Sequence, residues 1–107
     1  MNILAIIPAR GGSKTIPKKN LKLLNGKPLI YYSIIEAQKS KMITDLVVSS
    51  DSNKILSISQ KYKCDVIKRP KAISNDNTPM WPVAKHALNN LEKANNKIYD
   101  YVLILQP

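Results

Sequence analysis

The feature that most constrains the fold is a series of short, unbroken apolar runs separated by segments of helical character. Residues 2–7 and 45–50 form the clearest runs. A strand that is apolar at consecutive positions, and not only at alternate ones, is typical of a sheet covered on both faces. We therefore predict buried strands at both places, with further strands at residues 64–67 and 99–105.

Between these runs the apolar residues recur at helical spacing. Pro28 stands where a first helical turn accepts proline, and the pattern after it predicts a helix over residues 28–40. Residues 51–53 supply capping side chains for a second helix. A third helix is expected over residues 79–92, after a loop at residues 68–77. The apolar positions of the three helices are Leu29, Ile30, Ile34 and Ala37; Ile55, Leu56, Ile58 and Tyr62; and Val83, Ala84, Ala87, Leu88 and Leu91.

This alternation predicts the α/β class, with a doubly wound, mainly parallel sheet that carries helices on both faces. The crossovers are expected to be right-handed. Ligands bind such sheets beyond the carboxyl ends of the strands, so the segments after Ile7, Val48, Ile67 and Leu105 should line the site. The chain stops directly after its last strand, where a loop lining the crevice is expected to continue. We therefore expect residues 1–107 to be part of a longer protein.

The charge distribution indicates an anionic ligand. The chain has 17 Lys and Arg against 7 Asp and Glu, a net charge of +10. Such a balance attracts nucleic acid, acidic lipid or a nucleoside triphosphate. No acidic residue precedes Glu36, so residues 8–27 form a concentrated cationic segment. The later basic residues have the spacing of solvated surfaces.

Two observations concern location in the cell. Cys64 is the single cysteine and cannot form an internal disulfide. No apolar run approaches the ~20 residues of a membrane span, and the N-terminus lacks the layout of a secretory signal. We expect a soluble, cytoplasmic protein that has no membrane partner.

The connection over residues 8–27 is the segment that carries most of the chemistry. Structureless connections beyond ~12–15 residues are generally functional or disordered. Gly11 and Gly12 let the backbone approach a ligand closely, and successive N–H groups in such a turn can bind an anion. The segment matches neither the P-loop pattern nor the dinucleotide fingerprint. Phosphate binding and an ordinary basic surface loop both remain open at this point.

Three other residues have a functional and a structural interpretation. Asp51 follows a strand and could be a metal ligand, but an N-cap on the next helix accounts for it better. His86 has no partner at metal-ligand spacing and is expected at the surface. Cys64 is expected to be a buried thiol and not a nucleophile. One Trp, five Tyr and no Phe offer few platforms for stacking bases, which weakens a nucleic-acid interpretation.

Several motifs in order along the whole chain resemble the N-terminal part of the acylneuraminate cytidylyltransferases. These enzymes include the CMP-N-acetylneuraminic acid synthetases and their relatives for legionaminic or pseudaminic acid. The matching segments are Ile7-Pro-Ala-Arg-Gly-Gly-Ser-Lys-Thr-Ile-Pro-Lys-Lys-Asn20, Asn25-Gly-Lys-Pro-Leu29, Val47-Val-Ser-Ser-Asp51, Arg69-Pro70, Asp76 and Leu105-Gln-Pro107.

The resemblance implies a nucleotide-diphospho-sugar transferase-like, Rossmann-like fold that is truncated here after about four strands, as the N-terminal nucleotide-binding part of a cytidylyltransferase domain. It also implies transfer of CMP from CTP to the anomeric hydroxyl of a nonulosonic acid, with release of pyrophosphate and with Mg2+ as cofactor. The implied catalytic residues are Lys14 and Lys19. The implied nucleotide-binding residues are Arg10, Gly11, Gly12, Ser13, Asn20, Arg69, Thr78 and Met80, and Gln106 is implied to bind the sugar.

The chain departs from the family pattern in two ways. Thr15 and Lys18 stand where relatives frequently have glycine, and Met80 stands where they often have a serine hydroxyl. The family's continuation after Gln-Pro, its metal-binding aspartates and its dimerisation segment fall beyond residue 107. We therefore expect these residues alone to be inactive, the Mg2+ ligands to lie outside them, and the full-length protein to be a homodimer.

Two alternatives remain open. Another sugar nucleotidyltransferase, such as a CMP-Kdo synthetase, has a similar sheet and a different substrate. A small basic module that binds nucleic acid is suggested by the net charge, and it predicts steeply salt-dependent binding with no preference for CTP.

Overall fold

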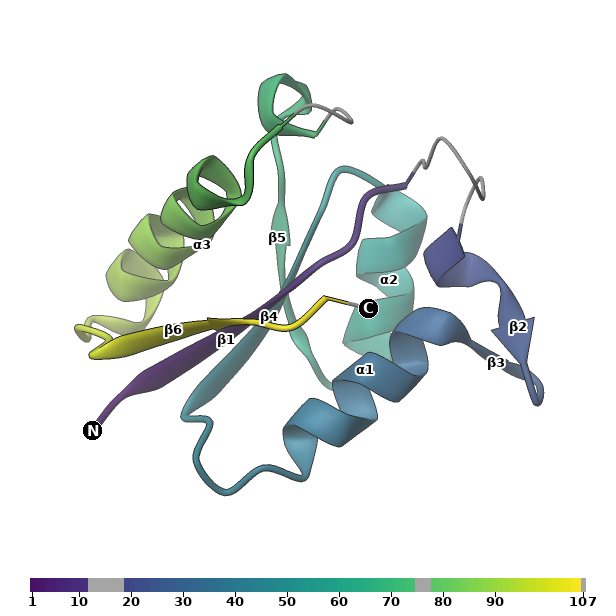
Figure 1. Ribbon diagram of the computed structural model, residues 1–107, viewed down its shortest axis with the longest axis horizontal. Helices are drawn as coiled ribbons and strands as arrows, with labels where there is room; N and C mark the ends of the chain where they lie inside the picture. Colours follow the sequence, from purple (N-terminus) through teal and green to yellow (C-terminus); the bar gives the residue numbers. More distant parts are fainter. Residues whose placement is uncertain (12–18, 75–77, 107) are drawn as a thin grey trace.

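The protein is built on a four-stranded parallel sheet, whose strands are labelled in Figure 1. The computed structural model describes residues 1–11, 19–74 and 78–106. The strands are β1 (Ile3–Pro8), β4 (Asp45–Ser50), β5 (Asp65–Lys68) and β6 (Tyr101–Ile104), in the order β5-β4-β1-β6. Every pairing between them is parallel, so the predicted doubly wound, mainly parallel sheet is confirmed.

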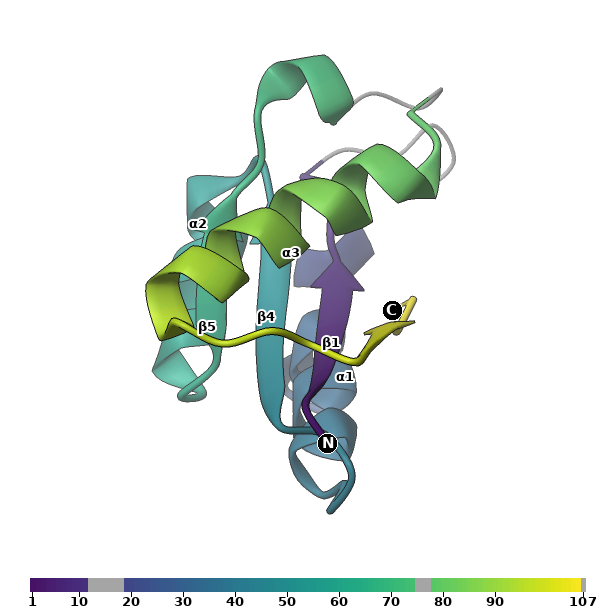
Figure 2. The ribbon, with the colours of Figure 1, turned by 90° about the vertical axis from the view of Figure 1, so that its left-hand side faces the viewer.

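Helices cover both faces of this sheet. The helices α1 (Leu29–Gln38) and α2 (Asn53–Lys61) lie on one face, and α3 (Met80–Asn95) lies on the other (Figure 2). Successive side chains of a strand point to opposite faces, so β1 contributes side chains to both cores. The core under α1 and α2 contains Ile7, Ala9, Ile30, Ile34, Val48, Ile55 and Cys64, and the core under α3 contains Leu4, Ile6, Val47, Ala87, Leu91 and Tyr99.

The predicted helices are present, with shifted ends. The third helix runs about one turn further than predicted because nothing after Glu92 interrupts it until Asn96, which takes a left-handed conformation at φ 49°. The predicted loop after β5 contains the short 3-10 helix η2 (Lys71–Ile73). No helix within the described ranges is both long enough and apolar enough to cross a membrane.

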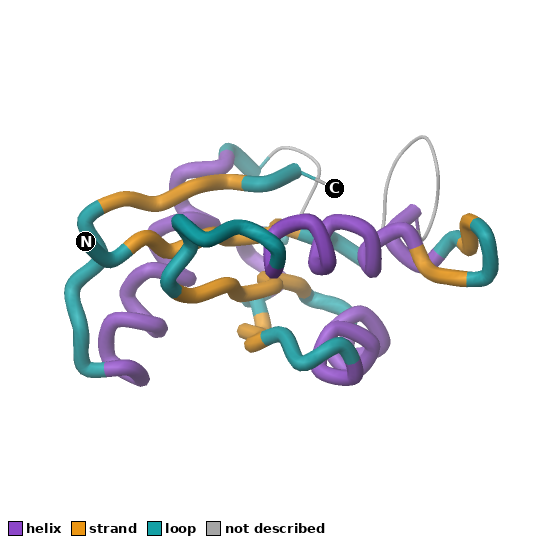
Figure 3. The backbone as a smooth tube through the Cα atoms, turned by 90° about the horizontal axis from the view of Figure 1, so that it is seen from below, coloured by secondary structure: helices purple, strands orange, loops and turns teal. Residues whose placement is uncertain are grey.

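The connection after β1 was predicted to be structureless. The structure shows that this is correct for only part of it. Its second half holds the 3-10 helix η1 (Lys19–Leu21) and a hairpin of β2 (Leu23–Leu24) and β3 (Lys27–Pro28). Asn25 and Gly26 form the turn, both at positive φ, as the tightest antiparallel hairpins require. Figure 3 shows the hairpin at one end of the molecule. The Asn-Gly pair was the signal that could have predicted it.

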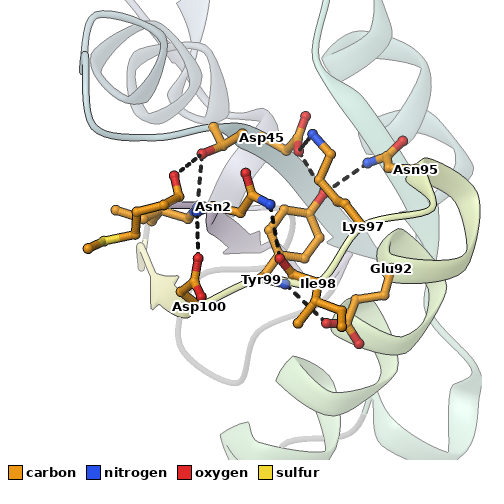
Figure 4. Close-up of polar contacts among 11 residues, drawn as sticks. Asn2, Asp45, Glu92, Asn95, Lys97, Ile98, Tyr99 and Asp100 are labelled. Carbon is orange, nitrogen blue, oxygen red and sulfur yellow. Dashed lines mark hydrogen bonds and ion pairs between the residues drawn. The ribbon is translucent and has the colours of Figure 1, made fainter.

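At the amino ends of the strands, a polar network ties α3 and β6 to β1 and β4 (Figure 4). The Tyr99 hydroxyl donates to Asp45 Oδ2 at 2.7 Å, and Lys97 Nζ lies 3.1 Å from the same oxygen. Asn95 Nδ2 donates to the Tyr99 hydroxyl at 2.9 Å. Burial and the hydrogen bond to Asp45 raise the pKa of Tyr99, so this hydroxyl stays protonated and remains a donor. The network fixes where β6 begins.

Replacement of Asp45 with Ala tests this network. It leaves the hydroxyl of the buried Tyr99 and the half-buried Lys97 ammonium without their shared acceptor, so we expect a loss of about 1–3 kcal/mol in the free energy of unfolding. Lys97→Met is the matched control, because it removes only the partly exposed ion pair and should cost about 1 kcal/mol or less. Urea denaturation measures both, and equal losses would contradict the central role of Asp45.

Candidate functional site

Backbone hydrogen bonds hold the start of the cationic segment against the carboxyl end of β4. Ala9 N–H donates to the Ser49 carbonyl at 2.9 Å, and Gly11 N–H donates to Asp51 Oδ1 at 2.9 Å. A Cβ on Gly11 would lie 2.9 Å from the Cβ of Ser52, closer than real Cβ atoms pack. Glycine is therefore required at position 11, because the backbone there closely approaches the loop that follows β4.

The predicted role of Asp51 as a helix cap is wrong. The N-cap of α2 is Ser52, whose Oγ accepts from Ile55 N–H at 3.3 Å. The Asp51 side chain instead points back to the loop after β1 and accepts the Gly11 N–H. Both residue types accept backbone N–H groups, so the sequence could not decide which of them would cap the helix.

Arg69 is a buried cation next to this junction, with only 3% of its surface exposed. Its Nε donates to Ser49 Oγ at 3.1 Å and its Nη2 to the Ser49 carbonyl at 2.9 Å. Burial lowers the pKa of Arg69, Asp51 acts in the opposite direction, and Arg10 adds to the lowering. In the described part of the chain, no carboxylate forms a salt bridge with this guanidinium. The site therefore holds concentrated positive charge near the sheet edge.

Asn20, in η1, is 7% exposed and reaches the same junction. Its Nδ2 donates to the Arg10 carbonyl at 3.3 Å. Its Oδ1 is shielded from solvent and has no hydrogen-bond partner. A buried acceptor left unpaired costs about 1–3 kcal/mol, so this oxygen is suited to a donor that a ligand brings.

The structure places the other predicted residues at the same edge of the sheet. Thr78 and Met80 are half-buried at the start of α3, which follows the end of β5. Gln106 is exposed and follows β6. Since β4 and β1 separate β5 from β6, Arg69 and Gln106 lie on opposite sides of the site. Gly12, Ser13 and Lys14 lie outside the described residues, as does the side chain of Lys19.

His86 differs from the prediction that it is an ordinary surface residue. It is half-buried on α3, and its Nδ1 is shielded from solvent without a hydrogen-bond partner. The pKa of His86 is lowered mainly by burial and to a smaller extent by the charge of Arg69. Its helical position one residue before Ala87 signals partial burial, but its proximity to Arg69 depends on the crossover of the chain.

Among the described residues, no cluster of three or more His, Cys, Asp or Glu side chains could hold a metal ion. No Mg2+ ligand is therefore assigned among the described residues, and no reaction step is assigned to a metal here. Mg2+ remains a prediction from the family resemblance.

The fold and the site define a doubly wound α/β protein with a cationic site at the carboxyl edge of its sheet. A family model described as cytidylyltransferase matches residues 4–105. The chain belongs to this cytidylyltransferase family, which confirms the resemblance found in its motifs.

Curated relatives with similar sequences include three enzymes of this kind. The chain is 45% identical over 92 residues to the CMP-N,N'-diacetyllegionaminic acid synthase of Campylobacter jejuni, which covers 85% of the chain and 39% of the relative. It is 42% identical to the pseudaminic acid cytidylyltransferase of the same species (98% and 45% covered). It is 36% identical to the N-acylneuraminate cytidylyltransferase of Escherichia coli (98% and 24% covered). The chain thus spans less than half the length of these relatives.

Solved structures that share the fold include two nucleotide-linked enzymes. A CMP:2-keto-3-deoxy-manno-octonic acid synthetase complexed with CTP superposes with a TM-score of 0.76 at 23% identity, over 99% of this chain and 40% of the other. A cytidylyltransferase from Leptospira borgpetersenii gives a TM-score of 0.74 at 21% identity, over 99% and 41%. At these identities the likeness concerns the fold alone.

Gly11→Ala tests the close approach between the two loops. The added Cβ meets Ser52 Cβ, so we expect destabilisation of about 1–3 kcal/mol from overpacking. Ser52→Gly removes the opposing Cβ, and although it weakens the α2 cap, it should absorb most of the Gly11→Ala cost in the double variant. A thermal-unfolding double-mutant cycle measures this coupling, and strictly additive losses would rule out the contact.

The thiol of Cys64 should be inert in the folded protein. It is buried against β4, and burial, with a smaller effect of Asp65, raises its pKa to about 12. Since the thiolate is the reactive form, a thiol reagent at pH 8 should label the protein only as it unfolds. The rate with and without urea measures this, and rapid labelling of the folded protein would contradict the burial.

Proposed function

We propose that residues 1–107 are the N-terminal, nucleotide-binding part of a cytidylyltransferase that transfers CMP from CTP to a nonulosonic acid. The observation that carries the proposal is the buried Arg69 guanidinium, held by Ser49 beside the Arg10–Gly11 turn at the carboxyl edge of the sheet. A buried cation with no described salt-bridge partner is suited to an anionic ligand, because the ligand compensates its cost of desolvation.

The proposed reaction requires positive charge close to the phosphates, and Arg10 and Arg69 lie at this edge of the sheet. The anomeric hydroxyl oxygen of the sugar acid attacks the α-phosphorus of CTP, the bond to the bridging oxygen breaks, and pyrophosphate leaves with its electron pair. The hydroxyl proton passes to a base that the described residues do not identify. Such a transfer depends on positioning and on stabilising charge at the phosphoryl oxygens. Arg10 and Arg69 supply fixed positive charge for that purpose.

Asn20 supports the nucleotide assignment in a different way. Its unpaired, buried Oδ1 can accept a hydrogen bond from a ribose hydroxyl or from the amino group of cytosine. Its amide is already oriented by the bond to the Arg10 carbonyl, so the acceptor needs little reorganisation when the nucleotide binds. Thr78 and Met80 border the same edge and are proposed to contact the nucleotide.

The remaining roles follow from the family. Lys14 and Lys19 are proposed to stabilise the triphosphate and the leaving pyrophosphate. The backbone of Gly11, Gly12 and Ser13 is proposed to surround the triphosphate. Gln106, which β4 and β1 separate from Arg69, is proposed to bind the sugar acid. The ligands of the proposed Mg2+, the dimer interface and full activity are assigned to the part of the relatives that this chain does not cover.

The substrate class is proposed from the names of the curated relatives, which act on legionaminic, pseudaminic or N-acylneuraminic acid. All three are nine-carbon keto sugar acids, so the proposal extends to the class and not to one of its members. The octonic acid synthetase supports only the shared fold, so that substrate is not favoured here.

Titration of the chain with CTP, with ATP and UTP as controls, tests the proposal. Trp81, the only tryptophan, adjoins Met80 and is 67% exposed, so its fluorescence provides a signal. In Mg2+ buffer at two salt concentrations we expect selective CTP binding that Arg10→Ala weakens by about 10-fold, as for one lost charge-assisted contact.

Lys22→Ala is the matched control for this titration. Lys22 is an exposed cation of the same connection to which no role is assigned, so its loss should change CTP affinity far less than the loss of Arg10. Equal, weak binding of all three nucleotides, with the two variants indistinguishable, would refute a dedicated nucleotide site in this chain.

A further inference from the structure

A groove separate from the candidate nucleotide site lies between the β2–β3 hairpin and α2, and none of the proposed nucleotide-binding residues lines it. Its volume is about 490 Å³, within the usual range of ligand sites. The lining combines apolar side chains with lysines, and none of the described residues that form it is acidic. The apolar members are Leu21, Leu23, Pro28, Ile58 and Tyr62, and the basic members are Lys27, Lys54 and Lys61.

The hairpin that forms one wall of this groove is fastened to α1, although it lies at one end of the molecule (Figure 3). Leu29 N–H donates to the Lys22 carbonyl at 2.9 Å. The Tyr32 hydroxyl donates to the Leu24 carbonyl at 2.5 Å. Backbone atoms of the hairpin are thus bonded to the start of α1, and the wall is in place before any partner binds.

The other wall, α2, is joined to the same helix by an aromatic contact. The rings of Tyr31 and Tyr62 meet edge to face, with their centroids 4.7 Å apart. Lys27 Nζ, from the hairpin, lies 5.4 Å from the centroid of the Tyr31 ring. Because both walls are fixed to α1, the groove needs little ordering when it is filled, which favours binding.

The chemistry of the two walls defines what the groove can bind. On α2, the helical spacing of Lys54, Ile58 and Lys61 places the half-buried isoleucine on one face with two exposed lysines. On the hairpin, Leu23 is 71% exposed although it lines the groove. In the described parts of the chain, no carboxylate forms a salt bridge with Lys54 or Lys61. Exposed apolar surface therefore lies beside positive charge that is free to pair with a partner.

We propose that this groove binds a peptide segment of a partner protein in which acidic side chains flank an apolar one. The apolar side chain packs against Leu23 and Ile58, which removes their exposed surface from water. The acidic side chains pair with Lys54 and Lys61, and this charge complementarity gives the groove its specificity. The proposal does not depend on the proposed nucleotide site.

Other occupants match the groove less well. A second copy of the chain has the same net charge of +10 and is repelled. A lipid surface would meet the tip of the hairpin first, and this tip is the polar pair Asn25 and Gly26. A nucleic acid matches the lysines but not the aliphatic side chains of Leu23 and Ile58, which offer no stacking platform for a base.

Fluorescence anisotropy of a short labelled peptide, with glutamates around a central pair of leucines, tests the apolar contact. Leu23→Ser changes an exposed side chain, so the fold should be retained while binding weakens about 10-fold. Leu24→Ser is the matched control, because Leu24 is an exposed leucine of the same strand that does not line the groove. This control should bind like the wild type, and equal affinities of the two variants would overturn the proposal.

A pair of double variants tests the charges. Lys54→Glu with Lys61→Glu places like charges opposite the peptide and should weaken binding at least ~10-fold at low salt. Lys85→Glu with Lys93→Glu makes the same change in net charge at exposed positions of α3 and should have a much smaller effect. Circular dichroism verifies that both are folded. Equal losses would mean that the peptide responds only to net charge, which would refute the groove as its site.

Three further probes decide the class of partner: an all-glutamate peptide, phosphatidylserine vesicles and a short RNA. We expect the peptide with leucines to bind most tightly. Tighter binding of vesicles or RNA that the same groove variants weaken would overturn the assignment to a peptide. These titrations contain no CTP, so a failure of CTP binding leaves their result unchanged, and a failure of peptide binding leaves the nucleotide site standing.

Discussion

The structure depends on one buried serine at the end of β4. Ser49 is fully buried, and its carbonyl accepts both the Ala9 N–H and Arg69 Nη2, while its hydroxyl accepts from Arg69 Nε. Three separate segments therefore meet at one residue: the exit of β1, the end of β4 and the turn after β5. Because the parallel register of β1 on β4 sets the position of Ser49, the pairing of the two central strands also sets where the Arg69 cation lies.

The two edges of the sheet differ in how their polar groups are satisfied. At the amino edge, Asp45, Asn95, Lys97 and Tyr99 satisfy one another, and the network fastens β6 to the fold. The buried side-chain atoms without partners in the described residues are Asn20 Oδ1 and His86 Nδ1, and both lie toward the carboxyl edge. The polar side chains of the amino-edge network satisfy one another, whereas unused hydrogen-bonding capacity lies toward the other edge, as expected where a ligand completes the structure.

The sequence predicts the sheet well because a strand buried on both faces has an unbroken apolar pattern that few other structures share. The strand at Asp45–Ser50 was predicted to the residue. The sequence predicts less well which of two chemically similar side chains makes a given hydrogen bond. Asp51 and Ser52 can both cap α2, and only the proximity of Gly11 draws Asp51 away. His86 was misjudged because its environment comes from Arg69, a residue distant in sequence that the crossover brings near.

The two sides of the candidate site are not equally complete. Around Arg69, on the proposed nucleotide side, the described residues bond to one another and leave a buried acceptor, Asn20 Oδ1. Around Gln106 they do not: the residue is exposed and borders an apolar groove between α1 and β6 that Tyr32, Leu103 and Leu105 help to line. Leu103 is 41% exposed there and the neighbouring Tyr101 58%. The proposed nucleotide side is therefore the more enclosed of the two, whereas Gln106, proposed to bind the sugar, borders an exposed apolar groove.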